Sequence, residues 1–201
     1  MRCCMIFQAI EFAAGAHRGQ YRKGSKIPYI IHPLNVGKIL IEHGCSDEVV
    51  IAGILHDTVE DTPVNLDNIR QGFGLKVADL VEAASEPDKS GTWENRKKHT
   101  IGMLKNLSHE AMILVLADKL DNIRAIREGL ERDGEGVWER FNRPREKQKW
   151  YYDSLMAVFT DSLTDEQSQN MLDFFNAEVV RVFGNVPQEM KSQSIDAARC
   201  F

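Results

Sequence analysis

The residues best suited to chemistry lie in one short stretch, directly after a run of apolar side chains. His56, Asp57, Glu60 and Asp61 follow the apolar residues 49–55. If this stretch is helical, residues four apart share a face, so the second polar pair stands one turn beyond the first. A histidine beside a carboxylate can bind a metal ion, and a nearby pair of carboxylates can move a proton. The alternative is a helix end whose charges meet water before the Thr-Pro sequence that stops it.

A second stretch, residues 111–127, repeats this design. Its strongly apolar half ends at Asp118, and Asp121 and Asn122 follow one turn later. A lone histidine, His32, precedes a proline that can open a helix. Helix ends in a bundle can converge, and their common target here is a cation, with candidate ligands His32, His56, Asp57 and Asp118. Two imidazoles with two carboxylates and no thiolate favour Mn²⁺, with iron, zinc or magnesium as alternatives. For His32 alone, a hydrogen-bonded core histidine is an equal alternative.

Composition limits the kinds of partner. The chain has 201 residues, 43% of them apolar, which is enough for one full core. A formal net charge of −5 argues against general nucleic-acid binding. Cys3, Cys4, Cys45 and Cys200 lack the spacing of a zinc site and are interpreted as reduced thiols. With no signal peptide and no apolar run of roughly 20 residues, the sequence predicts a soluble cytoplasmic protein without membrane partners, and leaves its oligomeric state open.

The apolar periodicity predicts an all-α fold of roughly eight to ten helices. No run of residues favours a strand, and polar, glycine-containing loops are expected at residues 20–29, 85–91 and 128–136. The expected helices cover residues 5–17, 34–43, 46–62, 64–73, 75–84, 93–107, 111–127 and 138–159, with one more packed helix and a looser end in residues 160–201.

Three ordered motifs resemble those of a known family. His32, the His56–Asp57 pair and the distant Asp118 resemble the metal-binding set of the HD phosphohydrolase superfamily. The runs AHRGQYRKGSKIPYIIHP, ILHDTVEDT and LADKLDNIR further resemble the Rel/Spo alarmone hydrolase domain, over about residues 5–155. The resemblance implies an HD-domain helical bundle in residues 1–160. Residues 161–201 are not covered by the resemblance, and their apolar residues predict a C-terminal helical extension packed on the same domain. Without a synthetase-like segment, the chain is expected to be a stand-alone small alarmone hydrolase.

The resemblance also implies roles for individual residues. One Mn²⁺ is expected on His32, His56, Asp57 and Asp118. Glu60 and Asp61 are the expected catalytic carboxylates, because a metal lowers the pKa of bound water and a neighbouring carboxylate can take its proton. Arg22 and Lys23 fall where the family contacts the nucleotide, and Asn122 falls where it approaches the ribose. The candidates for holding phosphate are Arg96, Lys97, Lys98, Arg143 and Lys147, and a solvated charged helix is an equal alternative for the last two.

Two positions depart from the family pattern. The Rel/Spo motif commonly reads Asp-Arg-Leu-His-Asn, whereas this chain has Asp118-Lys-Leu-Asp121-Asn122. Asp121 is expected to leave the metal ligand in place but to alter the charge beside the nucleotide. Ala125 stands where many long Rel/Spo proteins carry a hydroxyl residue. Both departures leave the preference for the base and the 5′-phosphates open.

The resulting prediction is a Mn²⁺-dependent hydrolase of the 3′-pyrophosphate of (p)ppGpp, giving GDP or GTP and pyrophosphate. One alternative keeps the site and changes the substrate to an adenosine alarmone, (p)ppApp, or to NADPH, from which the site would remove a phosphate. Another is an inactive HD module that only senses a nucleotide. Glu60 and Asp61 count against this last alternative, because a pure binding site needs no carboxylate pair beside a metal.

Overall fold

The structure is a computed structural model, and it describes residues 2–86 and 91–184 of the chain. Within these ranges the fold is all-α, as the sequence predicts, with one isolated β-bridge between Tyr21 and Pro28. None of the helices in the described ranges is long and apolar enough to cross a membrane. The elements are α1 (Arg2–Ala16), α2 (Ile31–Glu42), α3 (Asp47–Leu55), α4 (Thr58–Asp61), α5 (Leu66–Phe73), α6 (Leu75–Ala84), α7 (Trp93–Leu104), α8 (His109–Asp133), the 3-10 helix η1 (Gly134–Arg140), α9 (Arg145–Ser162) and α10 (Glu166–Phe183).

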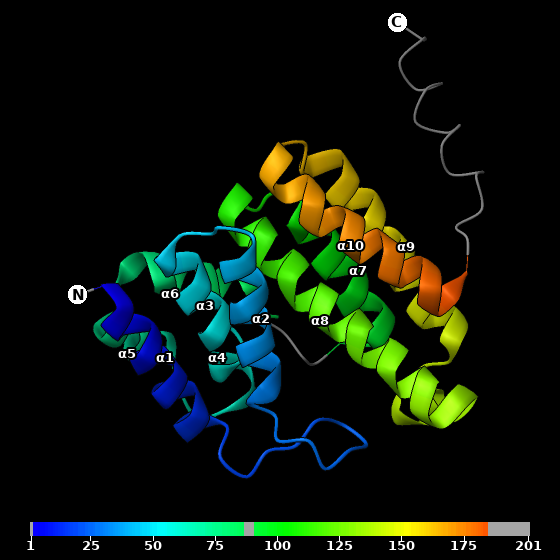
Figure 1. The fold of residues 1–201 in the computed structure, drawn as a ribbon, viewed down its shortest axis with the longest axis horizontal. Coiled ribbons are helices and arrows are strands. Elements are labelled where there is room, and N and C mark those ends of the chain that lie inside the picture. The colour runs from blue at the N-terminus through cyan, green and yellow to red at the C-terminus, as the bar shows by residue number, and fades with distance from the viewer. Residues whose placement is uncertain (1, 87–90, 185–201) are drawn as a thin grey trace, which may run out of the picture.

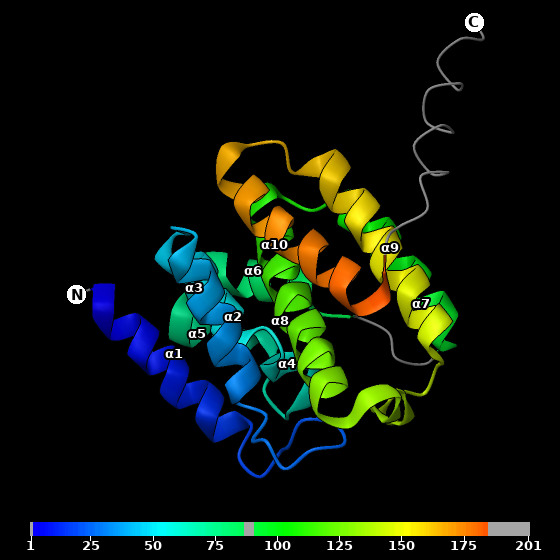
Figure 2. The ribbon, with the colours of Figure 1, turned by 45° about the vertical axis from the view of Figure 1, so that its right-hand side comes forward.

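The long helix α8 runs through the middle of the bundle. It packs against α2, α3 and α6 on one side and against α10 on the other (Figure 1). Turning the molecule shows α7 and α9 side by side beyond α10, and α1 outside α2 and α3 (Figure 2). The two apolar runs, residues 49–55 of α3 and residues 111–117 of α8, are buried along their whole length. Burial of both runs places their polar ends inside the molecule.

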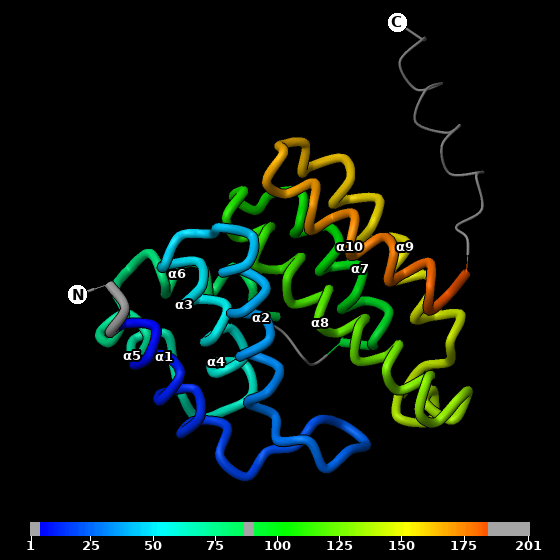
Figure 3. Tube along the Cα trace, in the orientation of Figure 1, coloured from blue at the N-terminus to red at the C-terminus, as the bar shows by residue number. Residues whose placement is uncertain are grey.

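Helices α2 and α3 lie close together because two glycines face the partner helix. A Cβ atom on Gly37 would lie 2.7 Å from Ile54 Cγ1, and one on Gly53 would overlap with Leu40 Cδ1. The Cα trace in Figure 3 shows the two helices running in opposite directions, so the start of α2 lies near the end of α3. This arrangement brings His32 and His56 to the same end of the pair.

Residues 46–62 were expected to form one continuous helix, and this expectation was wrong. Helix α3 ends at Leu55, His56 and Asp57 form a turn, and α4 begins at Thr58. The Thr58 hydroxyl donates to the Leu55 carbonyl at 2.7 Å, and a side chain that takes a backbone acceptor competes with the regular helix. The Asp61 N–H still donates to the Asp57 carbonyl at 2.9 Å, so the carboxylates remain one turn apart.

Two boundaries near the C-terminal half also differ from the prediction. Residues 128–136 were expected to be a loop, but α8 continues to Asp133, and η1 follows from Gly134, where φ is +58°. The helix predicted at residues 138–159 instead begins at Arg145. Pro144 lies at its N-cap, and the residue before a proline is driven out of the helical region.

Several predictions concern residues at the edges of the described part. Residue 160 lies within α9, and α10 packs against α8 and α9, while residues 185–201 lie outside the described residues. The domain division at residue 160 therefore stays a prediction. Cys45 is a free thiol, and burial raises its pKa to about 11. The side chains of Cys3 and Cys4, all of Cys200, and residues 87–90 of the predicted loop also lie outside the described part.

Candidate active site

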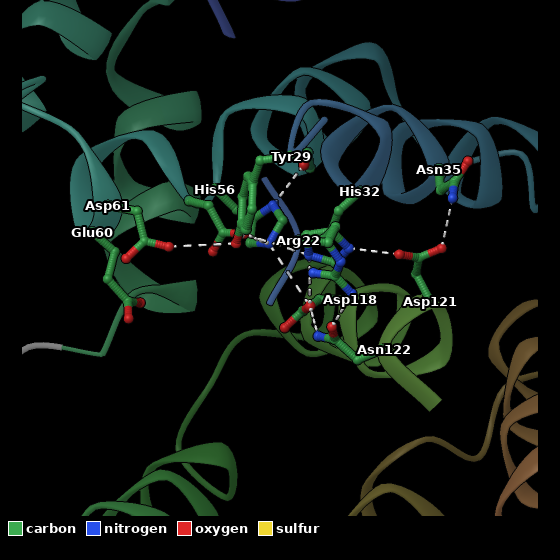
Figure 4. A network of polar contacts seen from close by, with 12 residues as sticks. Arg22, Tyr29, His32, Asn35, His56, Glu60, Asp61, Asp118, Asp121 and Asn122 are labelled. Carbon is green, nitrogen blue, oxygen red and sulfur yellow. Dashed lines mark hydrogen bonds and ion pairs between the residues drawn. The ribbon is translucent and has the colours of Figure 1, made fainter. Parts of the chain in front are cut away.

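The four predicted metal ligands meet where α2, α8 and the turn after α3 converge, and Figure 4 labels three of them, His32, His56 and Asp118. His32 Nε2 lies 3.2 Å from Asp118 Oδ1 and 3.4 Å from Asp57 Oδ2. His56 Nε2 lies 3.2 Å from the same oxygen of Asp57 and 3.8 Å from Asp118 Oδ1. Ligand atoms of His32, His56 and Asp118 all lie within 4.8 Å of one another. The sequence motif thus becomes a compact set of two imidazoles and two carboxylates.

This donor set fits a divalent cation. His56 Nε2 is buried and makes no hydrogen bond within the described structure, although it faces two carboxylates. Burial opposes ionisation of Asp57 and Asp118. The two histidines nevertheless hold the pKa of Asp57 below its usual range, and Lys119, followed by the two histidines, does the same for the pKa of Asp118. Two ionised carboxylates lie beside an imidazole nitrogen, His56 Nε2, that makes no hydrogen bond within the described structure. Carboxylate oxygens and imidazole nitrogens are ligands that divalent transition metals take.

Each histidine is held at its other nitrogen. His56 Nδ1 makes a 2.7 Å hydrogen bond with the Gly53 carbonyl. His32 Nδ1 lies 2.6 Å from Asp121 Oδ2, and the Asn35 amide donates to Asp121 Oδ1 at 2.9 Å. Asp121 lines the larger cavity described below, but both of its oxygens are engaged, and its side chain is buried among its partners. Both imidazoles therefore direct Nε2 toward the carboxylates.

The carboxylate ligands have partners of their own. The Tyr29 hydroxyl donates to Asp57 Oδ2 at 2.6 Å, and Lys119 Nζ donates to Asp118 Oδ2 at 2.6 Å. Burial opposes the charge of Lys119, but Asp118 raises its pKa well above the usual range. Asn122 also donates its amide N–H to Asp118 Oδ1. Sequence reasoning missed Tyr29 and Lys119, although each stands within a quoted motif and close to a predicted ligand.

The two predicted catalytic carboxylates lie next to this set, on α4. Asp61 Oδ2 lies 3.4 Å from the Tyr29 hydroxyl, and the Gln20 amide donates to the Asp61 carbonyl at 2.8 Å. Glu60 Oε2 accepts a hydrogen bond from the Glu86 backbone N–H at 3.1 Å. The short helix is therefore held from two sides, by the loop after α1 and by the chain beyond α6.

Two cavities meet at the cluster. The smaller, of about 180 Å³, contains the predicted ligands His56, Asp57 and Asp118 with Glu60 and Asp61 in its wall. The larger, of about 500 Å³, extends away between α2, α8 and the loop before α2. The residues that line both cavities are Arg22, Tyr29, His32 and Asn122. A molecule with two unlike ends can therefore place one end in each cavity.

The predicted substrate-binding residues divide into two groups. Arg22, Lys23 and Asn122 line the larger cavity, and Lys97 lines the smaller one together with Lys119, which the sequence analysis did not consider. Arg22 Nη2 donates to Asn122 Oδ1 at 2.9 Å, where the cavities meet. Lys97 Nζ lies 5.2 Å from the centre of the Tyr151 ring, a distance typical of a cation–π contact.

The remaining predicted cations do not line either cavity in the described part of the chain. Lys98 and Lys147 are exposed on helix surfaces. Arg143 donates from Nε and Nη2 to the two oxygens of Glu94, at 2.9 and 3.1 Å. Arg96 Nε lies 3.4 Å from Glu86 Oε1. For Arg143 and Lys147, this placement fits the alternative of a charged helix surface that is solvated or paired, and the phosphate-binding role of all four cations stays a prediction.

Known proteins resemble the chain in both sequence and fold. Residues 9–146 match the family described as HD domain. A mouse protein, guanosine-3′,5′-bis(diphosphate) 3′-pyrophosphohydrolase MESH1, is 43% identical over 122 residues, which cover 59% of this chain and 68% of the mouse protein. A protein of Aquifex aeolicus with the same enzyme name is 40% identical over 125 residues, 60% of this chain but only 18% of the longer relative.

Two solved structures share the fold. The protein lmo0812 from Listeria monocytogenes superposes with a TM-score of 0.71 at 39% identity, covering 77% of this chain and 99% of that one. A metazoan SpoT ortholog, described as hydrolysing ppGpp, also gives a TM-score of 0.71 at 29% identity, covering 90% of this chain and 97% of its own. The resemblance inferred from the three motifs is thereby confirmed. The chain belongs to the HD domain family and is homologous to its MESH1 and SpoT-type members.

Proposed function

We propose that the protein is a metal-dependent 3′-pyrophosphohydrolase that converts (p)ppGpp to pyrophosphate and GDP or GTP. The observation that carries the proposal is the pair of joined cavities, one with the metal-ligand cluster and carboxylates, the other of nucleoside size. The names of the MESH1 relatives and the activity of the metazoan SpoT ortholog support the same substrate.

We propose that His32, His56, Asp57 and Asp118 hold Mn²⁺. When bound, a divalent ion of this kind activates water and withdraws charge from phosphoryl oxygens. The carboxylates and imidazoles without thiolates support the choice of Mn²⁺. The cytoplasmic location and the absence of nucleic-acid partners are further proposals, which rest on the acidic composition and reduced cysteines.

The chain's own residues have separate tasks in this proposal. Hydrolysis forms a bond from water oxygen to the phosphorus nearest O3′ and breaks the bond from that phosphorus to O3′. Glu60 and Asp61 orient the water and take its proton, and the departing O3′ gains a proton to become the 3′-hydroxyl of GDP or GTP. Lys97 and Lys119 face the negative charge that gathers on the pyrophosphate in the smaller cavity. Arg22 and Asn122, at the junction, hold the ribose between the two ends of the substrate.

The proposal is tested by turnover of a substrate panel with purified, Mn²⁺-loaded protein. The panel contains ppGpp, pppGpp, ppApp, pppApp and NADPH, and products are separated by chromatography. The expected result is pyrophosphate with GDP or GTP from the guanosine substrates, and no turnover after removal of the metal by a chelator. Strong activity on adenosine alarmones or NADPH, with none on ppGpp, would overturn the guanosine assignment. No turnover of any substrate, with metal bound, would support a nucleotide sensor instead.

A further inference from the structure

We propose that Asp121 is a positioning residue that sets the affinity of this chain for its metal by orienting His32. This inference rests on the metal site of the proposed function. It concerns the position at which the chain has Asp121 and the Rel/Spo motif commonly has histidine. From the sequence, Asp121 was expected to alter the charge beside the nucleotide. Asp121 touches a predicted metal ligand, at 2.6 Å from His32 Nδ1, and this contact assigns it a different task.

Helix α8 holds the His32 imidazole at both of its nitrogens. Asp118 and Asp121 are three residues apart and share a face of the helix. Asp118 Oδ1 lies 3.2 Å from Nε2, while Asp121 Oδ2 lies 2.6 Å from Nδ1 (Figure 4). The ring lies between the two carboxylates, so rotation about its Cβ–Cγ bond would break both contacts.

The partners of Asp121 determine which nitrogen of His32 carries the proton. Asp121 Oδ1 accepts from the Asn35 amide, which is a donor at Nδ2, so the carboxylate acts as an acceptor. An accepting Oδ2 requires a proton on Nδ1 of His32, and a neutral ring then has its lone pair on Nε2. Nε2 is the atom that faces Asp118 and Asp57. Asp121 thus selects the tautomer that a metal needs.

A carboxylate partner also makes the imidazole a stronger ligand. A metal-bound histidine commonly donates its second N–H to a carboxylate, and loss of such a partner typically costs about 10- to 100-fold in metal affinity. Asp121 is only 7% exposed, so water screens this charge weakly. At His56 the same position is taken by the neutral Gly53 carbonyl, so the carboxylate-supported imidazole is that of His32.

The test compares two variants of the full-length chain, each stripped of metal and titrated with Mn²⁺ while free Mn²⁺ is followed by electron paramagnetic resonance. Asp121→Asn keeps an oxygen that can accept from Nδ1 but removes the charge, and a loss of about 10-fold in affinity is expected. Asp121→Leu removes both, and a loss toward 100-fold is expected. Nitrogen-15 spectra of the histidines in the metal-free protein, recorded at a pH where His32 is neutral, should show an Nδ1-protonated His32 in the wild type and a mixture of tautomers in Asp121→Leu.

Two controls separate positioning from general damage. Asp165→Asn changes another Asp–His pair, with 2.6 Å between Asp165 Oδ2 and His109 Nε2, and should leave the Mn²⁺ affinity unchanged. Thermal unfolding in chelator measures the metal-free fold, which Asp121→Asn should alter little. Wild-type affinity in both Asp121 variants would overturn the inference, as would a fall in metal-free stability with unchanged affinity.

The inference and the proposed function can fail separately. The Mn²⁺ affinities of the wild type, Asp121→Asn and Asp121→Leu can fall in the expected order while the wild type hydrolyses no alarmone. In that case the proposed function is overturned and the role of Asp121 stands. If His32→Ala binds Mn²⁺ as tightly as the wild type, His32 is not a ligand and the role of Asp121 is overturned, whatever the chain hydrolyses.

Discussion

At the scale of single residues, Glu60 and the metal ligands differ in what holds them. The predicted ligands form contacts with one another, whereas Glu60 Oε2 accepts a hydrogen bond from a backbone N–H, that of Glu86. Substitution of Glu60 therefore changes the chemistry beside the cluster without removing any donor atom from it.

Glu60→Gln should keep the metal and lose most of the rate. The Gln carbonyl can still accept from the Glu86 N–H, so α4 stays in place, but an amide cannot take a proton from water. A fall in kcat of about 10²- to 10⁴-fold is expected, the usual contribution of a general base. The measurement is steady-state turnover of ppGpp beside a Mn²⁺ titration, with the surface change Glu110→Gln as control. Full activity would assign the proton transfer to Asp61 alone.

The residue types in the sequence point to the metal-ligand cluster more directly than to the residues that contact the substrate. His56, Asp57 and Asp118 stand out because a charged or metal-binding group at the end of an apolar run needs a partner, whereas His32 stands out only as a lone histidine before a proline. The pair of His32 with Asp121 joins residues 89 positions apart, and the pair of Arg143 with Glu94 joins residues 49 apart. No local spacing reveals such pairs, so charge alone could not tell which of the predicted cations line the cavities.

At the scale of helices, the two glycines between α2 and α3 fix the separation of the two histidines. Gly53→Ala should lower both stability and Mn²⁺ affinity, because its Cβ would overlap with Leu40 Cδ1 and force the helices apart. Overpacking of this kind costs about 1–3 kcal/mol. The measurements are urea unfolding of the metal-free protein and Mn²⁺ titration.

The matched control is Gly102→Ala in α7. A Cβ at Gly102 meets nothing within 4 Å, so the added methyl group should stabilise the helix, by up to about 1 kcal/mol. Its Mn²⁺ affinity should equal that of the wild type. Equal affinities for Gly53→Ala and Gly102→Ala would show that the helix separation does not control the site.

The starts of α8 and α10 are joined by the contact of His109 with Asp165. Asp165 also accepts from the Ser168 hydroxyl and, as the N-cap of α10, from the Ser168 N–H. The Ser168 hydroxyl, the contact with His109 and the Ser168 N–H, in this order, lower the pKa of the Asp165 carboxyl. A folded-state pKa below the unfolded value adds stability above the unfolded pKa, near 3.9, and this contribution is lost as the pH falls toward the folded value.

Asp165→Ala should therefore cost about 1 kcal/mol at pH 7, as the loss of an N-cap usually does. Asp165→Asn retains a capping oxygen and should cost less. The difference between wild type and Asp165→Asn should shrink as the pH falls below about 4, where the carboxyl becomes protonated in the unfolded chain. Urea unfolding at about pH 7, 4 and 3 measures these differences, and a difference that stays constant down to about pH 3 would contradict the account.

Helix boundaries were predictable where a residue breaks the backbone pattern and not elsewhere. Helix α6 begins and ends at the predicted residues, 75 and 84, since Gly74 and Ser85 flank it. The break between α3 and α4 contains neither glycine nor proline, and the interaction observed there is the hydrogen bond from the Thr58 hydroxyl to the Leu55 carbonyl. The apolar run therefore suggested a longer helix than the chain forms.

At the scale of the whole molecule, the proposed ligands come from α2, the α3–α4 turn and α8, so bound metal would link distant parts of the chain. Mn²⁺ at about 100 times its Kd should add about 2.7 kcal/mol to the free energy of unfolding. For a chain of this size, that corresponds to a rise of about 5–10 °C in Tm. Calorimetry with and without Mn²⁺ measures the rise, and Asp57→Ala should abolish both the rise and turnover.

A rise retained in Asp57→Ala would place the metal elsewhere. A rise that is lost in Asp57→Ala, together with a normal Tm in chelator, would assign the stabilisation to the cluster rather than to general ion binding.

The junction of the two cavities has a kinetic consequence. Arg22, Tyr29, His32 and Asn122 belong to both cavities, yet each cavity has a lining of its own. Once the substrate is cut, its two products lie in separate compartments and neither must leave before the other. GDP should therefore inhibit the enzyme from the larger cavity while pyrophosphate occupies the smaller one. Inhibition by the two products together should exceed what mutually exclusive binding allows, which a double-inhibition plot measures directly.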